Sequence, residues 1–188
     1  MKIYTKTGDD GTTGLFYGGR VAKDSVLPTA YGAVDEAQAA LGLARAAGED
    51  DELEELLVRL CRELYVAMAE LATLPENRSK LVAGTTLVTE EMVDALDAHI
   101  DDITERFDAP TEFVIPGQNE VAARLDWARV IVRRAEREGQ PAHVEGSHVL
   151  RYLNRLSDLV WALARWQEGA ALATRVEPST QPPSSTAG

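Results

Sequence analysis

Apolar residues recur every three or four positions in five successive stretches of the chain, which is the spacing of amphipathic α-helices. The first stretch runs from about Thr29 to Ala47, and the second ends before Pro75. The third begins after Thr89, a residue type that caps helices and is followed here by two acids. The fourth runs from Pro116-Gly117 to Gly139. The apolar positions of stretches two to five are, in order, Leu53, Leu56, Leu57, Leu60, Leu64, Met68 and Leu71; Met92, Leu96, Ile100, Ile103 and Phe107; Val121, Leu125, Ala128 and Val132; and Leu150, Leu153, Leu156, Val160 and Leu163.

Helices of roughly twenty residues joined by short connections predict an antiparallel bundle. No strand pattern interrupts them, so the expected fold class is all-α: a five-helix bundle preceded by a glycine-rich N-terminal segment. Residues 1–173 are predicted to form one helical domain, of which residues 1–25 are the glycine-rich segment. Residues 174–188 are rich in proline, serine and threonine, and we expect a disordered tail there.

Charge and cysteine content narrow the possible partners. The chain of 188 residues has a net charge of −12, which disfavours nucleic acid and anionic membrane surfaces. Cys61 is the only cysteine, so an intrachain disulfide is excluded, as expected in a reducing compartment. No apolar signal region opens the sequence, and the expected location is cytoplasmic.

The segment YTKTGDDGTTGLFYGG, residues 4–19, is rich in glycine and threonine and is flanked by Lys23. Glycines let backbone amides approach a ligand closely, and amides together with hydroxyls and lysines can form an anion cradle. The segment does not match a Walker loop, because no Gly-Lys-Ser/Thr ends it. A flexible N-terminal arm with turn residues is an equally acceptable interpretation.

The fourth helix contains ARVIVRRAERE, in which Arg129, Arg133 and Arg137 are spaced by four and therefore share a face. Guanidinium groups bind phosphate through two parallel hydrogen bonds, so this face is a candidate polyphosphate site. The alternative is a solvated surface whose charge is compensated by nearby glutamates.

Two further helices carry polar residues beside apolar ones. On the fifth, Asn154 and Asp158 lie one turn apart, and Asn154 is equally suited to reading a nucleoside or to a buried hydrogen bond between helices. On the first, Asp35 and Glu36 lie in an alanine-rich stretch. Asp35 is expected either to be solvated or to pair with an arginine and hold it in place.

Three segments together resemble the PduO-type ATP:cob(I)alamin adenosyltransferases: YTKTGDDGTTGL…GGRVAKD, FVIPG…ARVIVRRAER and YLNRLSD. They occur in the order and at the separations of that family and span residues 3 to about 166. The resemblance implies transfer of the 5′-deoxyadenosyl group of ATP to the cobalt of cob(I)alamin, with release of triphosphate. It also implies a homotrimer with active sites between subunits.

The resemblance further implies roles for individual residues. ATP, with magnesium, would be held by the loop segment 1–25 and by the fourth and fifth helices. Asp35 of one chain would pair with Arg129 of the next, and Arg133 would act on the phosphates during catalysis. Phe113 would lie below the corrin ring of cobalamin. The implied ATP-binding residues are Thr5, Lys6, Thr7, Gly8, Thr13, Gly14, Lys23, Arg133, Arg134, Glu136, Arg137 and Asn154.

Two positions of this chain depart from the family pattern. Gln38 stands where the family often has Asn or Ser, and Gln118 stands where it often has Gly. These departures concern contacts to the corrin ring rather than the reaction. Possible protein partners implied by the resemblance are a cob(II)alamin reductase and an enzyme that uses adenosylcobalamin, and no metal site made of protein side chains is expected.

Two other functions are compatible with parts of the pattern. An ATP-binding sensor would keep the arginines and the glycine-rich loop, but it would have no use for Phe113. A purely structural bundle would have solvated charges and would bind no ATP. From the sequence alone, Phe113 is more simply interpreted as a plug of the hydrophobic core.

Overall fold

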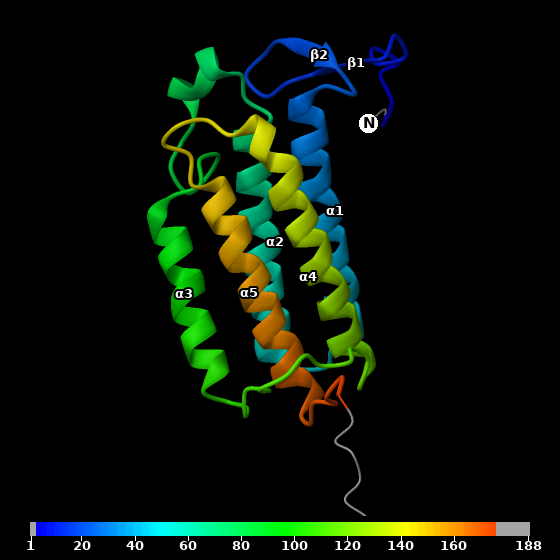
Figure 1. The fold of residues 1–188 in the computed structure, drawn as a ribbon. Helices are drawn as coiled ribbons and strands as arrows, with labels where there is room; N and C mark the ends of the chain where they lie inside the picture. Colours follow the sequence, from blue (N-terminus) through cyan, green and yellow to red (C-terminus); the bar gives the residue numbers. More distant parts are fainter. Residues whose placement is uncertain (1–2, 176–188) are drawn as a thin grey trace, which may run out of the picture.

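Five α-helices of the computed structural model, which describes residues 3–175, run alternately down and up the molecule (Figure 1). Two short 3-10 turns, η1 and η2, follow α2 and α4. The predicted helical fold class is therefore confirmed. None of the described helices has the length and apolar character that a membrane span requires. The bounds are α1 Val26–Ala47, α2 Asp51–Leu71, η1 Pro75–Lys80, α3 Glu90–Thr104, α4 Glu120–Gly139, η2 Gln140–Ala142 and α5 Val149–Glu168.

Helix α4 packs between α1 and α5, and α2 and α3 complete the bundle. The buried face of α1 consists mainly of alanines, which lets α4 approach α1 closely. The apolar positions predicted for α2 and α5 are buried, apart from partly buried Met68 and Leu150. Thr89 caps α3 as expected, with its hydroxyl accepting a hydrogen bond from the Met92 N–H at 3.4 Å.

Two helix starts differ from the prediction, and a side-chain cap explains one of them, the start of α4. Helix α4 begins at Glu120 rather than at Pro116-Gly117, since the Asn119 side chain accepts a hydrogen bond from the Ala122 N–H at 2.8 Å. Helix α1 begins at Val26, three residues before Thr29. Pro28 lies in its first turn, where the missing N–H would have no helical partner.

The expectation that the chain contains no strand was wrong. Strand β1 (Thr12–Gly14) pairs antiparallel with β2 (Arg20–Ala22), and the pair lies above the start of α1 (Figure 1). Each strand has three residues, too few to show an alternation of apolar and polar positions. The turn between them is attached to the end of α2 by a hydrogen bond from the Phe16 N–H to the Ala72 carbonyl at 2.9 Å.

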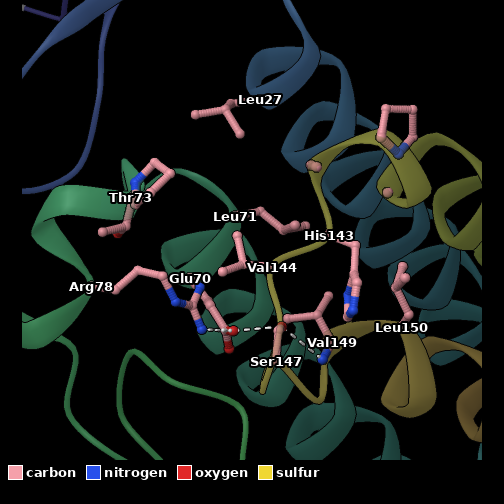
Figure 2. Close-up of a pocket in the computed structure, with 14 residues that line it drawn as sticks. Leu27, Glu70, Leu71, Thr73, Arg78, His143, Val144, Ser147, Val149 and Leu150 are labelled. Atoms are coloured by element: carbon pink, nitrogen blue, oxygen red, sulfur yellow. Dashed lines mark hydrogen bonds and ion pairs between the residues drawn. The ribbon is translucent and has the colours of Figure 1, made fainter.

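A buried carboxylate joins the connections at this end of the bundle (Figure 2). The Glu70 side chain is 1% exposed and accepts hydrogen bonds from Arg78 at 2.8 Å, the Val88 N–H at 2.8 Å and the Ser147 hydroxyl at 2.6 Å. These donors come from η1, from the segment before α3 and from the segment before α5. Glu70 therefore holds three loops together beside a cavity of about 170 Å³.

Replacing Glu70 by Gln should destabilise the fold by about 3–5 kcal/mol, because it leaves Arg78 without its carboxylate in a largely buried site. Glu54 is a matched control on the same helix, since it pairs with Arg45 at 2.9 Å while both side chains are close to half exposed. Glu54→Gln should cost less than about 1 kcal/mol. Urea unfolding of both variants measures the difference, and equal losses would show that Glu70 is no anchor.

Candidate functional site

The antiparallel strand pair gives the glycine-rich segment a defined shape. The Lys23 N–H donates a hydrogen bond to the Gly11 carbonyl at 2.9 Å. This bond holds the residue that follows β2 beside the residue that precedes β1. The Lys23 side chain then lies against Gly8, where a Cβ atom would be 3.2 Å from the ammonium nitrogen and 3.0 Å from the Thr12 carbonyl oxygen. A side chain at position 8 would be tightly packed against both atoms, so glycine lets the Lys23 side chain lie this close.

Lys6 lies in the same turn with a φ of 62°, a left-handed conformation that is unusual for a residue with a side chain. The hydroxyls of Thr5 and Thr7 on either side of it are 2.7 Å apart. Thr13 and Gly14 lie in strand β1, and Lys6 and Lys23 are both exposed. The implied ATP-binding residues of the segment thus lie in one loop, called the cationic loop below after its exposed lysines Lys6 and Lys23. Residues 4–25 as a whole carry three basic and three acidic side chains: Lys6, Arg20 and Lys23 against Asp9, Asp10 and Asp24.

Arg20 of β2 braces this loop, and the sequence interpretation missed it. Its Nη2 atom donates to the Thr7 carbonyl at 2.6 Å and to the Thr12 hydroxyl at 2.6 Å. The Thr12 hydroxyl donates in turn to the Asp10 carboxylate at 2.7 Å, and this bond and the one from the Thr12 N–H lower the pKa of Asp10. A short strand pairing is what brings Arg20 to Thr7, and it could not be read from the sequence.

Arg133, Arg134 and Arg137 lie in the last two turns of α4, and this end of α4 is at the end of the bundle where the loop lies (Figure 1). Arg133 and Arg137 are exposed, and the Arg137 side chain donates to the Arg133 carbonyl at 3.0 Å. Arg134 forms an ion pair with Glu36 of α1. Among residues 3–175, no hydrogen bond or ion pair joins the loop to Arg133 or Arg137, so a ligand would have to bridge them.

Asn154 faces α4 across a groove of about 270 Å³, where its amide donates to the Glu136 carboxylate at 3.3 Å. This is the hydrogen bond between helices that was one of the two expectations for Asn154. Arg151 and Arg155 line the same groove and were also missed. They pair with Glu90 at 3.3 Å and Asp97 at 2.7 Å on the α3 side, which explains why α5 carries them.

Asp35 and Arg129 are not brought together within one chain. Asp35 is exposed on α1 and forms no ion pair among the described residues. Arg129 is partly exposed, and its Nε atom lies 3.3 Å from the Asp126 carboxylate one turn earlier on α4. The pair that the resemblance implies lies between two chains, and it stays a prediction.

Phe113 is 89% exposed, so its interpretation as a core plug was wrong. Its backbone pairs with the segment that follows α5: the Thr174 N–H and hydroxyl donate to the Phe113 carbonyl at 2.8 and 2.7 Å. The Ile115 N–H donates to the Leu172 carbonyl at 2.8 Å. The ring is thus held out into solvent by a backbone that is fixed on one side.

The segment between α3 and α4, to which Phe113 belongs, lies at the opposite end of the molecule from β1 and β2 and from the cationic loop (Figure 1). Phe113 precedes the first residue of α4, Glu120, whereas the loop lies near the last, Gly139. Because an α-helix rises about 1.5 Å per residue, α4 alone separates the two ends by about 30 Å. His, Cys, Asp and Glu side chains within residues 3–175 form no group of three or more that could hold a metal ion.

Known proteins with related sequences are corrinoid adenosyltransferases. The family described as cobalamin adenosyltransferase matches residues 3–167. Corrinoid adenosyltransferase PduO of Salmonella typhimurium is 40% identical over 174 residues, which are 91% of this chain and 51% of that protein. The corrinoid adenosyltransferase of Mycobacterium tuberculosis is 41% identical over 171 residues, 87% of each chain. The chain spans about half the length of PduO from Salmonella typhimurium and from Citrobacter freundii.

Solved structures agree with the sequence matches. A variant PduO-type ATP:corrinoid adenosyltransferase from Lactobacillus reuteri, complexed with cobalamin and ATP, is similar with a TM-score of 0.82 and 30% identity over 93% of this chain and 97% of that one. A second variant from the same organism, complexed with ATP, gives a TM-score of 0.81 and 29% identity over 92% of this chain and all of that one. With the family match over residues 3–167, these likenesses show that the chain belongs to the cobalamin adenosyltransferase family.

Proposed function

We propose that this protein is an ATP:corrinoid adenosyltransferase, which transfers the 5′-deoxyadenosyl group of ATP to the cobalt of cob(I)alamin. The observation that carries the proposal is the likeness over nearly the whole described chain to an adenosyltransferase complexed with both cobalamin and ATP. The exposed cationic loop and the α4 arginines at the same end of the bundle support it.

The loop and the helices divide the recognition of ATP between them. Lys6, Lys23 and the threonines of the loop bind the triphosphate, and Gly8 lets the Lys23 side chain lie close to the backbone of the loop. Arg133 and Arg137 approach the phosphates from α4, while Arg134 is oriented by Glu36. Asn154 and Glu136 bind the nucleoside in the groove between α4 and α5. ATP enters as its magnesium complex, in which the ion neutralises part of the phosphate charge.

The reaction needs no nucleophile from the protein. The cobalt(I) electron pair forms the new cobalt–carbon bond at C5′, the bond between C5′ and the phosphate oxygen breaks, and triphosphate leaves with that bond's electrons. Negative charge grows on the leaving oxygen, and a fixed guanidinium such as that of Arg133 stabilises it most in the transition state. The remaining work of the protein is to hold the two substrates in line.

Phe113 acts on the second substrate. Its exposed ring covers the lower face of the corrin and keeps water and the cofactor's own base from the cobalt. Without a lower ligand, cobalt(II) is more easily reduced to cobalt(I). The backbone bonds from Thr174 hold the ring in place without covering it.

A neighbouring chain completes the site, because ATP is much shorter than the length of α4 that separates the loop from Phe113. The outer face of α1 and α4 supports contact with a second copy, since it exposes apolar side chains beside charged ones. Trp127 is 57% exposed and Leu43 is 51% exposed, and a bond from Arg124 to the Leu43 carbonyl at 2.9 Å fixes their ends of the two helices together. We propose a closed homotrimer, in which Asp35 of one chain pairs with Arg129 of the next.

Two partner enzymes belong to the same proposal. A cob(II)alamin reductase has to supply the electron, and an enzyme that uses adenosylcobalamin takes up the product. Both reactions suit a reducing, cytoplasmic location.

Purified protein should convert ATP and cob(I)alamin to adenosylcobalamin with one triphosphate per turnover. The change in the cobalamin spectrum measures product, and anion-exchange chromatography separates triphosphate from pyrophosphate and phosphate. Binding of ATP without adenosylation under strict reduction would support the sensor function instead. Pyrophosphate and phosphate in place of triphosphate would contradict the mechanism.

Replacing Phe113 by Ala should lower adenosylation that starts from cob(II)alamin about tenfold or more, equivalent to ~1.4 kcal/mol in the barrier. The loss should be much smaller when cob(I)alamin is supplied, since the ring acts on the reduction. The melting temperature should hardly change, because the ring is 89% exposed. Tyr65→Ala, an exposed aromatic residue on α2, is the control and should leave both rates unchanged. Equal losses from both cobalamin states would contradict the proposed role.

A further inference from the structure

A second buried charged group lies near the opposite end of the bundle from Glu70, between α4 and α5. The Arg165 side chain is 2% exposed, and its Nη2 atom donates to the Asp126 carboxylate at 2.5 Å. Its Nε atom lies 2.7 Å from the Glu168 carboxylate, whose pKa is raised because it is buried. Burying ions costs several kcal/mol each, so such a group is tolerated only when its charges are paired.

Arg129 also belongs to this group, because the buried residues alone do not contain a cation for each carboxyl group. Asp126 and Glu168 are two carboxyl groups and Arg165 is one guanidinium, so the buried set alone contains more carboxyl groups than cations. Arg129 supplies the missing cation, since its Nε atom donates to the second oxygen of Asp126 at 3.3 Å. Asp126 therefore lies between a buried guanidinium and a partly exposed one.

Because Arg129 contacts Asp126 through Nε, the other two guanidinium nitrogens remain available for a second partner. Nε is the nitrogen nearest the backbone, so a bond there orients the guanidinium plane and leaves its two terminal nitrogens for another partner. Among residues 3–175 those terminal nitrogens form no hydrogen bond or ion pair. The Arg129 side chain is 31% exposed, which leaves them accessible from outside the chain.

We propose that Asp126 is a positioning residue for Arg129: fixed by buried Arg165, it holds Arg129 through Nε so that the terminal nitrogens face a carboxylate of a second copy of the chain. The inference rests on the proposed function and names a residue on which the contact between copies depends. Asp126 differs in this from an ordinary surface partner, because its side chain is only 7% exposed and Arg165 restricts its movement. The Glu120–Arg124 pair on the same helix shows the contrast, since the Glu120 side chain is 71% exposed.

A double-mutant cycle tests the proposal. Asp126→Asn should lower kcat/KM about tenfold in the otherwise native chain and hardly at all in an Arg129→Gln background, because contacting residues are not additive. Glu168→Gln removes the other carboxylate of Arg165 without touching Arg129, and it should lower the melting temperature while leaving kcat/KM within about twofold. Glu120→Gln is the exposed control and should change neither quantity.

Each alternative outcome has its own meaning. Equal losses from Asp126→Asn in both backgrounds, or the same loss of activity from Glu168→Gln, would show that the buried group only stabilises the fold and would overturn the proposal. A native chain that forms no adenosylcobalamin would instead contradict the proposed function. A silent Asp126→Asn in an active enzyme also overturns the inference.

A measurement on the native chain covers the case in which Asp126→Asn does not fold or Arg129→Gln is inactive. The Arg129 Nε–H should give a slowly exchanging ¹H–¹⁵N signal, which is identified by its loss in Arg129→Lys. Exchange as fast as that of the Arg62 Nε–H, an exposed arginine on α2, would show that Asp126 does not hold the guanidinium.

Discussion

Helix length is the constraint on which the rest of this structure depends. The twenty residues of α4 keep the cationic loop and the exposed Phe113 ring about 30 Å apart. Helix α4 is packed between α1 and α5, the Asn119 side chain caps its start, and the connection that follows it is bonded to Glu70 through Ser147. Within one chain the cationic loop and Phe113 are therefore too far apart to meet over one pair of substrates, which is why the proposed function includes a second chain at the site.

The two buried charged groups, one around Glu70 and one around Arg165, lie near opposite ends of the bundle and stabilise different parts of it. Glu70 joins the loops at the end where the strand pair is attached, and the turn between the strands is bonded to the end of α2 at the same place. Asp126 and Arg165 lie toward the other end and, by our proposal, orient Arg129 toward a neighbouring chain. In both groups a carboxylate without its cation would be costly, which makes the local geometry stiff.

The helices could be predicted from the sequence because burial of one apolar face repeats every three or four residues, as from Leu53 to Leu71 in α2. The strands could not, since three residues carry no such period. The start of α4 was misplaced because a proline and glycine suggested a start that the Asn119 side chain overrides. Phe113 was expected in the core on its apolarity alone, but what matters is that Thr174 holds its backbone at the surface.

The candidate site residues likewise divide into those that the sequence suggested and those that it did not. The loop and the arginines Arg133, Arg134 and Arg137 were proposed from their chemistry and spacing, and the structure places the Lys23 side chain close to Gly8. Arg20, Asp126 and Arg165 were missed because a charged residue on an amphipathic helix or short strand is ordinarily solvated. Their roles arise from contacts between segments distant in sequence, such as the 39 residues that separate Asp126 from Arg165.

The central claim is that each site takes its cationic loop from one chain and Phe113 from another. Assemblies that mix two variants of the chain test this claim. One parent carries Lys6→Ala with Lys23→Ala and the other carries Phe113→Ala, so each parent alone should be nearly inactive from cob(II)alamin. When equal amounts are unfolded and reassembled together, about a quarter of the sites should receive an intact loop and an intact Phe113 from different chains. Return of about a quarter of the native activity is the predicted result. Activity no higher than the mean of the two parents, in assemblies shown to contain both chains, would contradict the account.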